Sequence, residues 1–205
     1  MTARSSPDGV TIRARKDEWR RRLVAARRAL PPQVHAARAR ALTAGAVELA
    51  ATVDGPVCAY LPIGTEPGSP ALVEVLRAAG HEVVLPVVPQ LPGPLDWARF
   101  EGVDALVAGP LRLRQPAGAR LGPAMIERAG LVLVPALAAD RGGARLGRGG
   151  GFYDRTLPLA APATPLVVLL NDDELVSELP AEPHDHRVSA ALLADAGFTT
   201  LGNRT

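Results

Sequence analysis

Short, continuous apolar runs are the feature that most constrains how this chain can fold. Leu131 to Val134 and Leu166 to Leu170 contain no polar residue, which is the pattern of strands covered on both faces in a parallel sheet. Val57 to Leu61 and Glu82 to Val88 predict two further strands, and Leu95 to Phe100 predicts a strand at an edge. The sequence therefore indicates a sheet whose central strands are buried.

Helical patterns separate these runs. Apolar residues recur every three or four positions from Arg15 to Leu30, and the same spacing resumes after Pro31-Pro32, which ends one helix and starts the next. Ser69-Pro70 opens a third helix, which Gly80 closes. Alternating strands and helices predict an α/β fold, with an open, mostly parallel sheet and helices on both faces. We expect one domain over residues 13–205, after a disordered tail over residues 1–12. The apolar stripe expected on the first helix consists of Trp19, Leu23, Ala26 and Leu30.

Composition excludes several classes of protein. Hydrophobic residues make up 47% and charged residues 21% of the chain, which argues against disorder of the whole chain. The single cysteine, Cys58, cannot form an internal disulfide, and its apolar surroundings predict a buried thiol. No apolar run approaches the ~20 residues of a membrane span, and no apolar signal segment begins the chain, so we expect a cytoplasmic protein with no membrane partner.

Positive charge is concentrated near the N-terminus. Between Arg13 and Arg40 lie ten basic and two acidic residues, which suggests a polyanion such as nucleic acid, a membrane surface or nucleotide phosphates. A solvated helix face is the better interpretation for most of these arginines. Lys16, Arg20 and Arg27 fall within about 40° of one another on the first helix. They either reach a phosphate in a neighbouring crevice or extend over the edge of the core.

The clearest chemical signal is the glycine–arginine loop, residues 142–155. It follows the buried run Leu131 to Val134, and the carboxyl ends of such strands form the ligand crevices of open α/β sheets. Six glycines occupy ten consecutive positions, so backbone N–H groups can approach an anion, helped by a helix starting near Phe152. Arg145 and Arg148 add planar cations suited to phosphate. The loop is neither a P-loop nor a G-x-G-x-x-G turn, and we expect a nucleotide-phosphate site of another kind.

Together these residues resemble the 5-formyltetrahydrofolate cyclo-ligase family, also called 5,10-methenyltetrahydrofolate synthetases, over nearly the whole chain after the tail. The segment from Gly143 to Arg155 looks like the family's signature loop, and the helix from Lys16 to Leu30 looks like its N-terminal motif. Tyr60 to Glu66, with Val84 to Pro86 downstream, is similar to its substrate-pocket segments.

The resemblance implies an ATP-dependent ligase. The formyl oxygen of 5-formyltetrahydrofolate is phosphorylated, N10 closes the ring, and phosphate leaves, giving 5,10-methenyltetrahydrofolate and ADP. A formamide-like oxygen is a poor leaving group, so its activation needs a phosphoryl donor held by cations and Mg²⁺. The implied partners are ATP, Mg²⁺ and the folate, with no nucleic acid, and we expect a monomer.

The resemblance also assigns roles to residues. Arg145, Arg148 and Tyr153 are the expected catalytic residues, and Asp154 is the expected Mg²⁺ ligand. By residue type alone, Glu66 would be an ordinary solvated carboxylate in a turn. The residues expected to bind ATP are Lys16, Arg20, Arg145, Gly147, Arg148, Gly149, Gly150, Gly151, Phe152 and Tyr153. The residues expected to bind folate are Tyr60, Leu61, Glu66, Arg148, Gly151 and Tyr153.

Three positions depart from the family pattern. Ala139 stands where an aromatic residue is usual, Gln115 replaces a glutamate, and Ser189 stands where a second acidic metal ligand is expected. With Ser189 a poorer ligand, Mg²⁺ would rely on Asp154, ATP and water. Because of these departures, a second hypothesis stays open: a relative of the family that binds nucleotide but acts on another substrate or has a regulatory role. The arginine-rich helices leave a third hypothesis, a nucleic-acid-binding module, whose affinity for nucleic acid would fall steeply with salt concentration.

Other polar and aromatic clusters have simpler structural explanations. His184-Asp185-His186 has too few ligands nearby for a metal site and predicts an exposed turn. Asn171 to Glu174 follows a strand and predicts a helix N-cap with favourable charge. Trp97 and Phe100 could stack on a pterin, but at their positions core packing is the better interpretation.

Overall fold

The structure, a computed structural model, describes residues 11–202 apart from the side chain of Arg112. Its α-helices are α1 (Ile12–Ala29), α2 (Pro32–Ala50), α3 (Ala71–Ala78) and α4 (Phe152–Thr156). The main sheet contains β1 (Val57–Cys58), β2 (Val83–Val87), β3 (Asp96–Arg99), β6 (Leu131–Val134), β9 (Leu166–Leu170), β11 (Ala190–Leu193) and β12 (Gly197–Thr200). Two small sheets contain β4 (Leu106–Ala108), β5 (Arg114–Pro116), β7 (Ala138–Asp140), β8 (Arg145–Leu146) and β10 (Leu175–Val176). The 3₁₀ turns are η1 (Val103–Ala105), η2 (Pro110–Arg112), η3 (Pro123–Arg128), η4 (Leu157–Leu159) and η5 (Asp172–Glu174).

The main sheet has seven strands in the order β12-β11-β9-β6-β1-β2-β3. Parallel pairing joins β2, β1, β6, β9 and β11, whereas β3 and β12 pair antiparallel at the two edges. The predicted open, mostly parallel sheet is therefore confirmed, including the edge strand at residues 96–99. The strands β11 and β12 were not identified from the sequence, although Ala190–Leu193 is a continuous apolar run.

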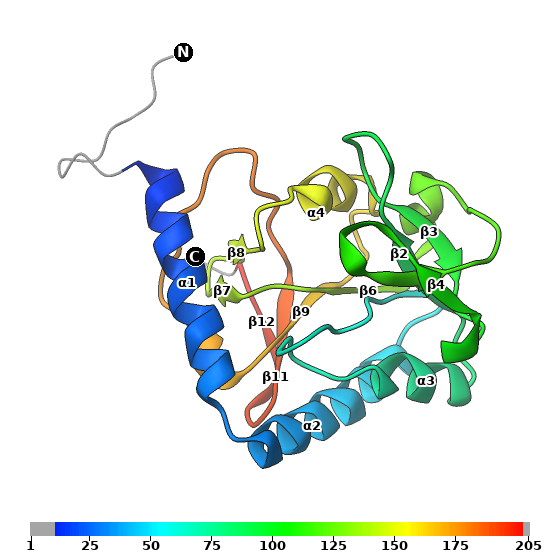
Figure 1. Cartoon of the computed structure of the whole chain (residues 1–205), viewed down its shortest axis with the longest axis horizontal. Helices are drawn as coiled ribbons and strands as arrows, with labels where there is room; N and C mark the ends of the chain where they lie inside the picture. The colour runs from blue at the N-terminus through cyan, green and yellow to red at the C-terminus, as the bar shows by residue number, and fades with distance from the viewer. Residues whose placement is uncertain (1–10, 203–205) are drawn as a thin grey trace.

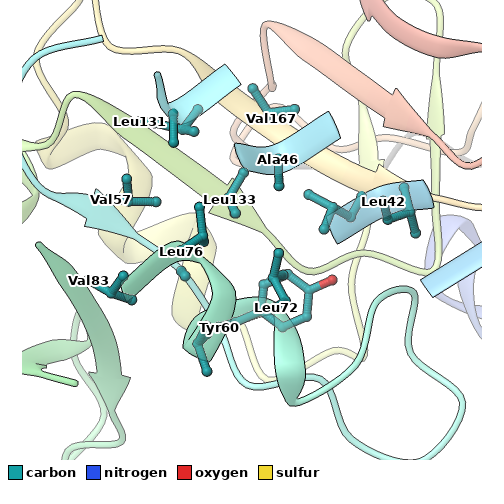
Figure 2. Packing of buried hydrophobic residues seen from close by; sticks show 14 of the residues in the cluster. Leu42, Ala46, Val57, Tyr60, Leu72, Leu76, Val83, Leu131, Leu133 and Val167 are labelled. Carbon is teal, nitrogen blue, oxygen red and sulfur yellow. The ribbon is translucent and has the colours of Figure 1, made fainter. Parts of the chain in front are cut away.

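Helices α2 and α3 cover one face of this sheet, and α4 lies on the opposite side (Figure 1). Leu42 of α2 and Leu72 of α3 are fully buried and pack toward the strand residues Leu133 and Val167 (Figure 2). On the other face, the strand residues pack under η3 and η4, so both faces of the central strands are dry. This two-sided burial is the reason that the central strands read as uninterrupted apolar runs.

The buried single residues behave as predicted. Cys58 is fully buried in β1, and burial raises the pKa of its thiol well above the ordinary value. Trp97 and Phe100 are buried in the core, which confirms packing rather than an exposed stacking role. Asn171 caps η5 with a complete capping box, although the element it caps is a single 3₁₀ turn.

Several predicted boundaries need correction. The strand predicted over residues 57–61 is reduced to Val57–Cys58, because the chain turns away from the sheet toward the cavity described below. Ser69 provides no side-chain cap for α3, although its carbonyl accepts the Leu72 N–H at 2.9 Å. Residues 1–10 of the predicted tail lie outside the described residues, whereas Thr11 caps α1 and Ile12 begins it. The single-domain organisation stays a prediction. Within residues 11–202, no helix has the length and apolar character needed to cross a bilayer.

The predicted apolar stripe of α1 is wrong in part. Ala26 is exposed and Leu30 only half-buried, whereas the buried residues of α1 are Lys16, Leu23 and Arg27. Leu23 joins a small apolar cluster with residues of β7 and β8, beside which α1 stands in Figure 1. Cations occupy the buried face because carboxylates from distant segments meet them there.

Gly143 sets the turn between β7 and β8. Its φ of +84° lies in the region that favours glycine, and a Cβ there would meet the Val188 carbonyl oxygen at 2.5 Å. Its own carbonyl accepts the Val188 N–H at 2.9 Å. The turn therefore fixes how the start of the glycine–arginine loop sits against the segment that precedes β11.

We expect Gly143→Ala to lower the free energy of unfolding by about 2 kcal/mol, because the new methyl group meets backbone that has little room to move. Urea denaturation measures the change. Gly118→Ala is the matched control, since a Cβ at Gly118 meets nothing within 4 Å. Equal stabilities of the two variants would contradict the close approach at Gly143.

Candidate active site

A cavity of about 1030 Å³ lies beyond the carboxyl ends of the central strands. Tyr60 and Leu61 follow β1, and Pro135 to Leu137 follow β6, so the sheet itself supplies one wall. Residues of α1, the glycine–arginine loop and α4 supply the others. The cavity is where open α/β sheets place their ligands. Every residue predicted to bind ATP, folate or metal lines it.

The glycine–arginine loop keeps its shape through backbone geometry that favours glycine. Gly149 and Gly151 have φ values of +98° and +66°, and Gly151 directly precedes α4. Arg155 donates from Nη2 to the Gly150 carbonyl at 3.0 Å and from Nε to the Gly93 carbonyl at 2.9 Å. The predicted helix start near Phe152 is confirmed.

Each predicted phosphate-binding cation has a carboxylate partner in the structure. Lys16 Nζ lies 2.8 Å from Glu182 and 2.6 Å from Asp185. Arg20 pairs with Asp17 at 2.5 Å and donates from Nε to the Gly147 carbonyl at 2.9 Å. The remaining pairs are Arg145 with Asp154 at 2.6 Å and Arg148 with Glu66 at 2.9 Å. The charges of these four cations are thus balanced locally.

Arg145 is the most buried of these cations, with 4% of its side chain exposed. Burial lowers the pKa of its guanidinium, which the nearby Asp154 partly offsets. The group still stays protonated at neutral pH, as arginine does in proteins. Its Nε is buried and has no hydrogen-bond partner among the described residues. Arg145 therefore retains an unused donor within a confined, low-dielectric site.

Two tyrosines differ in how their hydroxyls are used. The Tyr60 hydroxyl donates to the Pro67 carbonyl at 2.9 Å, whereas the buried Tyr153 hydroxyl has no partner within residues 11–202. Burial raises the pKa of both phenols, so they stay neutral and can donate a hydrogen bond at neutral pH. A buried hydroxyl without a partner is unfavourable, so Tyr153 is suited to donate to a ligand.

The carboxylate of Asp154 has the chemistry that its predicted role as a Mg²⁺ ligand requires. Its Oδ1 accepts from Arg145 Nη2 at 2.6 Å and from the His186 N–H at 3.3 Å. Both bonds use the same oxygen, which leaves Oδ2 for another ligand, and carboxylate oxygen is a donor that Mg²⁺ prefers. Ser189 does not line the cavity: its hydroxyl bonds the Leu166 backbone.

Sequence reasoning missed the acidic partners of Lys16. Asp185 lies in the turn predicted to be exposed, but its side chain is only 12% exposed and bonds Lys16. His186 is half-buried as well, so of the three residues of that turn only His184 is exposed as predicted. Glu182, His184 and Asp185 have ligand atoms within 4.8 Å of one another, with Lys16 already bound to two of them. Nothing local marked Glu182, because its partner is 166 residues away.

Gln115 was noted only as a departure from a pattern, yet the structure places it in the cavity wall. Its Oε1 is buried and accepts no hydrogen bond from the residues that the structure describes. Ala139, the other departure near the loop, is fully buried in β7 and does not reach the cavity.

Comparison with known proteins agrees with this geometry. The sequence profile described as the 5-formyltetrahydrofolate cyclo-ligase family matches residues 12–194. The chain belongs to this family. A 5-formyltetrahydrofolate cyclo-ligase of Mycolicibacterium smegmatis is 42% identical over 191 residues, which cover 91% of this chain and 97% of that protein. The Escherichia coli K12 cyclo-ligase is 34% identical over 166 residues, or 78% and 89% of the two chains.

Solved structures share the cyclo-ligase fold. The solution structure of 5,10-methenyltetrahydrofolate synthetase from Aquifex aeolicus superposes with a TM-score of 0.74 at 21% identity, covering 93% of this chain and 94% of that one. A methenyltetrahydrofolate synthetase from Mycoplasma pneumoniae superposes with a TM-score of 0.67 at 20% identity, covering 86% and 96%. The architecture is therefore that of the cyclo-ligase family.

The Lys16–Asp185 pair has a pH dependence whose sign follows from its pKa values. Burial by itself raises the pKa of Asp185, but hydrogen bonds from Lys16 and the Glu182 N–H outweigh it and leave this pKa below its ordinary value. Burial likewise lowers the pKa of Lys16, but its two carboxylate partners outweigh it and raise this pKa. Asp185 therefore stabilises the fold above its unfolded-state pKa, and this contribution is lost as the pH falls through the folded-state pKa.

We expect Asp185→Asn to lower the free energy of unfolding by about 1 kcal/mol at pH 7. The difference from wild type should shrink as the pH falls below about 4, because the Asp185 carboxyl of the unfolded wild-type chain then binds a proton more readily than that of the folded protein. Urea denaturation at pH 7, 5 and 3 tests this. Asp173→Asn serves as the control, because Asp173 is 64% exposed and lies 3.5 Å from Arg38. A deficit that persists unchanged at pH 3 would argue against the charged pair.

Proposed function

We propose that this protein converts 5-formyltetrahydrofolate and ATP to 5,10-methenyltetrahydrofolate, ADP and phosphate. One observation carries the proposal. A single cavity joins a cluster of cations and glycine backbone, suited to a triphosphate, to an aromatic and apolar wall suited to a folate. Membership of the cyclo-ligase family supports the same reaction.

The ATP phosphates would lie against α1 and the glycine–arginine loop. Lys16 and Arg20 approach from the helix, and Arg145 and Arg148 approach from the loop. The backbone of residues 147–153 would supply N–H donors between them. An incoming triphosphate replaces the carboxylates as the partner of at least some cations, so binding is an exchange of anions rather than the filling of an empty positive site.

The folate would occupy the part of the cavity bounded by Tyr60, Leu61 and Tyr153. Glu66 lies at the junction with the phosphates, because its Oε1 accepts from Arg148 Nε at 2.9 Å and its Oε2 accepts from the Ile63 N–H at 3.1 Å. The polar edge of a pterin would compete with Arg148 and the Ile63 N–H for the Glu66 oxygens. Its flat ring would stack against the apolar wall of the cavity. Gly151 and Arg148 would then border both substrates.

The proposed reaction needs electrostatic stabilisation rather than a protein nucleophile. The formyl oxygen attacks the γ-phosphorus and releases ADP; N10 then attacks the activated carbon and loses its proton, and the C–O bond breaks to release phosphate. Arg145 and Arg148 neutralise charge on the transferred group, and the Tyr153 hydroxyl donates to an oxygen of the reacting centre. When bound, Mg²⁺ supplies charge neutralisation of the phosphates, and Asp154 would hold it together with ATP oxygens and water.

The structure weakens the case for a nucleic-acid-binding module. Lys16, Arg20 and Arg27 face the protein and bond to its own carboxylates and carbonyls. These cations are therefore directed into the cavity and core, which leaves the outward arginines of α1 and Arg40 of α2 for a polyanion. A monomeric state and a cytoplasmic location remain predictions of the sequence.

The formation of methenyltetrahydrofolate, followed by absorbance with 5-formyltetrahydrofolate, ATP and Mg²⁺, tests the activity. We expect Arg145→Ala to lower kcat/KM for ATP by about 10²-fold, because a buried cation at the phosphates is lost. The control is Arg99→Ala, since Arg99 is 63% exposed and pairs with Glu82 away from the cavity. Unaltered ATP kinetics in Arg145→Ala would remove this arginine from the mechanism; ATP binding without product would favour another substrate.

Tyr153→Phe and Tyr60→Phe form a matched pair. Removing the unpartnered Tyr153 hydroxyl should lower kcat about tenfold while leaving thermal stability unchanged. Removing the Tyr60 hydroxyl should lower stability by about 1 kcal/mol, because it breaks the bond to Pro67. Kinetics and thermal denaturation of both variants distinguish these roles. A Tyr153→Phe enzyme with wild-type kcat would show that the hydroxyl takes no part.

A further inference from the structure

Helix α1 carries two of the proposed ATP-binding cations but has little apolar surface to dock it. Leu23 is its only buried apolar residue within the described part of the chain, and Trp19 and Val24 pack against the same small cluster while partly exposed. The other buried residues of α1 are Lys16 and Arg27. So small an apolar contact fixes the tilt and rotation of an 18-residue helix only weakly. The position of α1 therefore depends on its polar contacts.

The side-chain contact of α1 with Glu174, on the far side of Leu23 from Lys16 and Arg20, is also its most buried ion pair. Arg27 and Glu174 have side chains only 1% and 3% exposed. Arg27 Nε lies 2.6 Å from Glu174 Oε1 and Nη2 lies 2.8 Å from Oε2, which is a bidentate pair. The same Nη2 donates to the carbonyl oxygens of Ala136, at 2.8 Å, and Leu137, at 3.3 Å.

The acceptors of this network are themselves fixed. Asn171 donates to Glu174 from its backbone N–H at 2.9 Å and from Nδ2 at 2.8 Å, so the carboxylate is oriented before Arg27 meets it. Asn171 directly follows β9, and Ala136 and Leu137 follow the neighbouring strand β6. Ala136 and Leu137 also line the cavity. Arg27 thus ties α1 to the carboxyl ends of two adjacent strands and to the cavity wall.

We propose that Arg27 and Glu174 are positioning residues that set where Lys16 and Arg20 stand in the ATP subsite; this rests on the proposed function. The helix rise of 1.5 Å per residue puts Lys16 about 16 Å from Arg27 along the axis. Over that length a tilt of about 5° moves Lys16 by more than about 1 Å, and a misplacement of this size can slow a reaction about 10²-fold. Neither residue touches substrate, so both act through α1.

Arg27→Lys and Glu174→Gln test the proposal through the two Michaelis constants. Lysine keeps the charge at position 27 but cannot contact Glu174 and both carbonyls at once. We expect the KM for ATP to rise about tenfold in both variants while the KM for 5-formyltetrahydrofolate stays within about twofold of wild type. If Glu174→Gln fails to fold, Arg27→Lys still tests the same contacts, because it leaves no uncompensated buried charge.

The control for a merely structural role is Leu42→Ala, a core truncation between α2 and the sheet, outside the apolar cluster that α1 joins. At equal loss of thermal stability, Leu42→Ala should leave the KM for ATP unchanged. An equal rise of this KM in the control, or none in Arg27→Lys, overturns the proposal.

Hydrogen exchange separates failure of this proposal from failure of the proposed function. In the full-length ligand-free protein, the backbone amide hydrogens of α1 should exchange faster in Glu174→Gln and Arg27→Lys than in wild type. The amide hydrogens of α2 should exchange at the wild-type rate. Unchanged α1 exchange overturns the positioning role. Absence of cyclo-ligase activity in wild type, with faster α1 exchange in the variants, would reject the substrate assignment and retain the control of α1 by this pair.

Discussion

The structure depends on a balance of charge inside one cavity. Lys16, Arg20, Arg145 and Arg148 all line it, and like charges confined beside low-dielectric walls repel strongly. Each is paired with at least one carboxylate, and those carboxylates come from α1 itself, the segment after β1, α4 and the segment before β11. Apart from the Arg20–Asp17 pair within α1, the pairs therefore hold together different elements of the chain around the site.

The ion pairs differ in solvent exposure. This difference separates pairs that hold the site rigid from pairs that can exchange a partner for a ligand. Lys16 and Arg145 have 8% and 4% of their side chains exposed, and removing one partner of such a pair leaves a buried charge. Arg148 is 50% exposed, so its pair with Glu66 is better screened and easier to exchange for a ligand. The adaptable pair is also the one that lies between the two proposed subsites.

The three departures from the family pattern have different consequences. Ala139 packs in the interior, and Ser189 bonds backbone at the start of β9, so neither side chain faces the cavity. Gln115 does line the cavity and has a buried acceptor without a protein partner. Of the three departures, Gln115 is therefore the one that changes the cavity wall itself relative to the family pattern.

Local sequence determined the four buried strands β1, β2, β6 and β9, the break between α1 and α2, and the glycine–arginine loop beyond β6. Hydrophobic periodicity, proline and glycine act over a few residues, which is why these features could be predicted. The family resemblance supplied the remaining candidate residues, all of which meet in one cavity. Only the tertiary structure decided which face of α1 is buried, since Ala26 faces solvent and Arg27 does not. It also decided that Glu174 and Asp185 would neutralise cations about 150 residues or more away in the chain. Such pairs are invisible to periodicity because a charged residue reads as exposed until the fold brings its counter-charge within bonding distance.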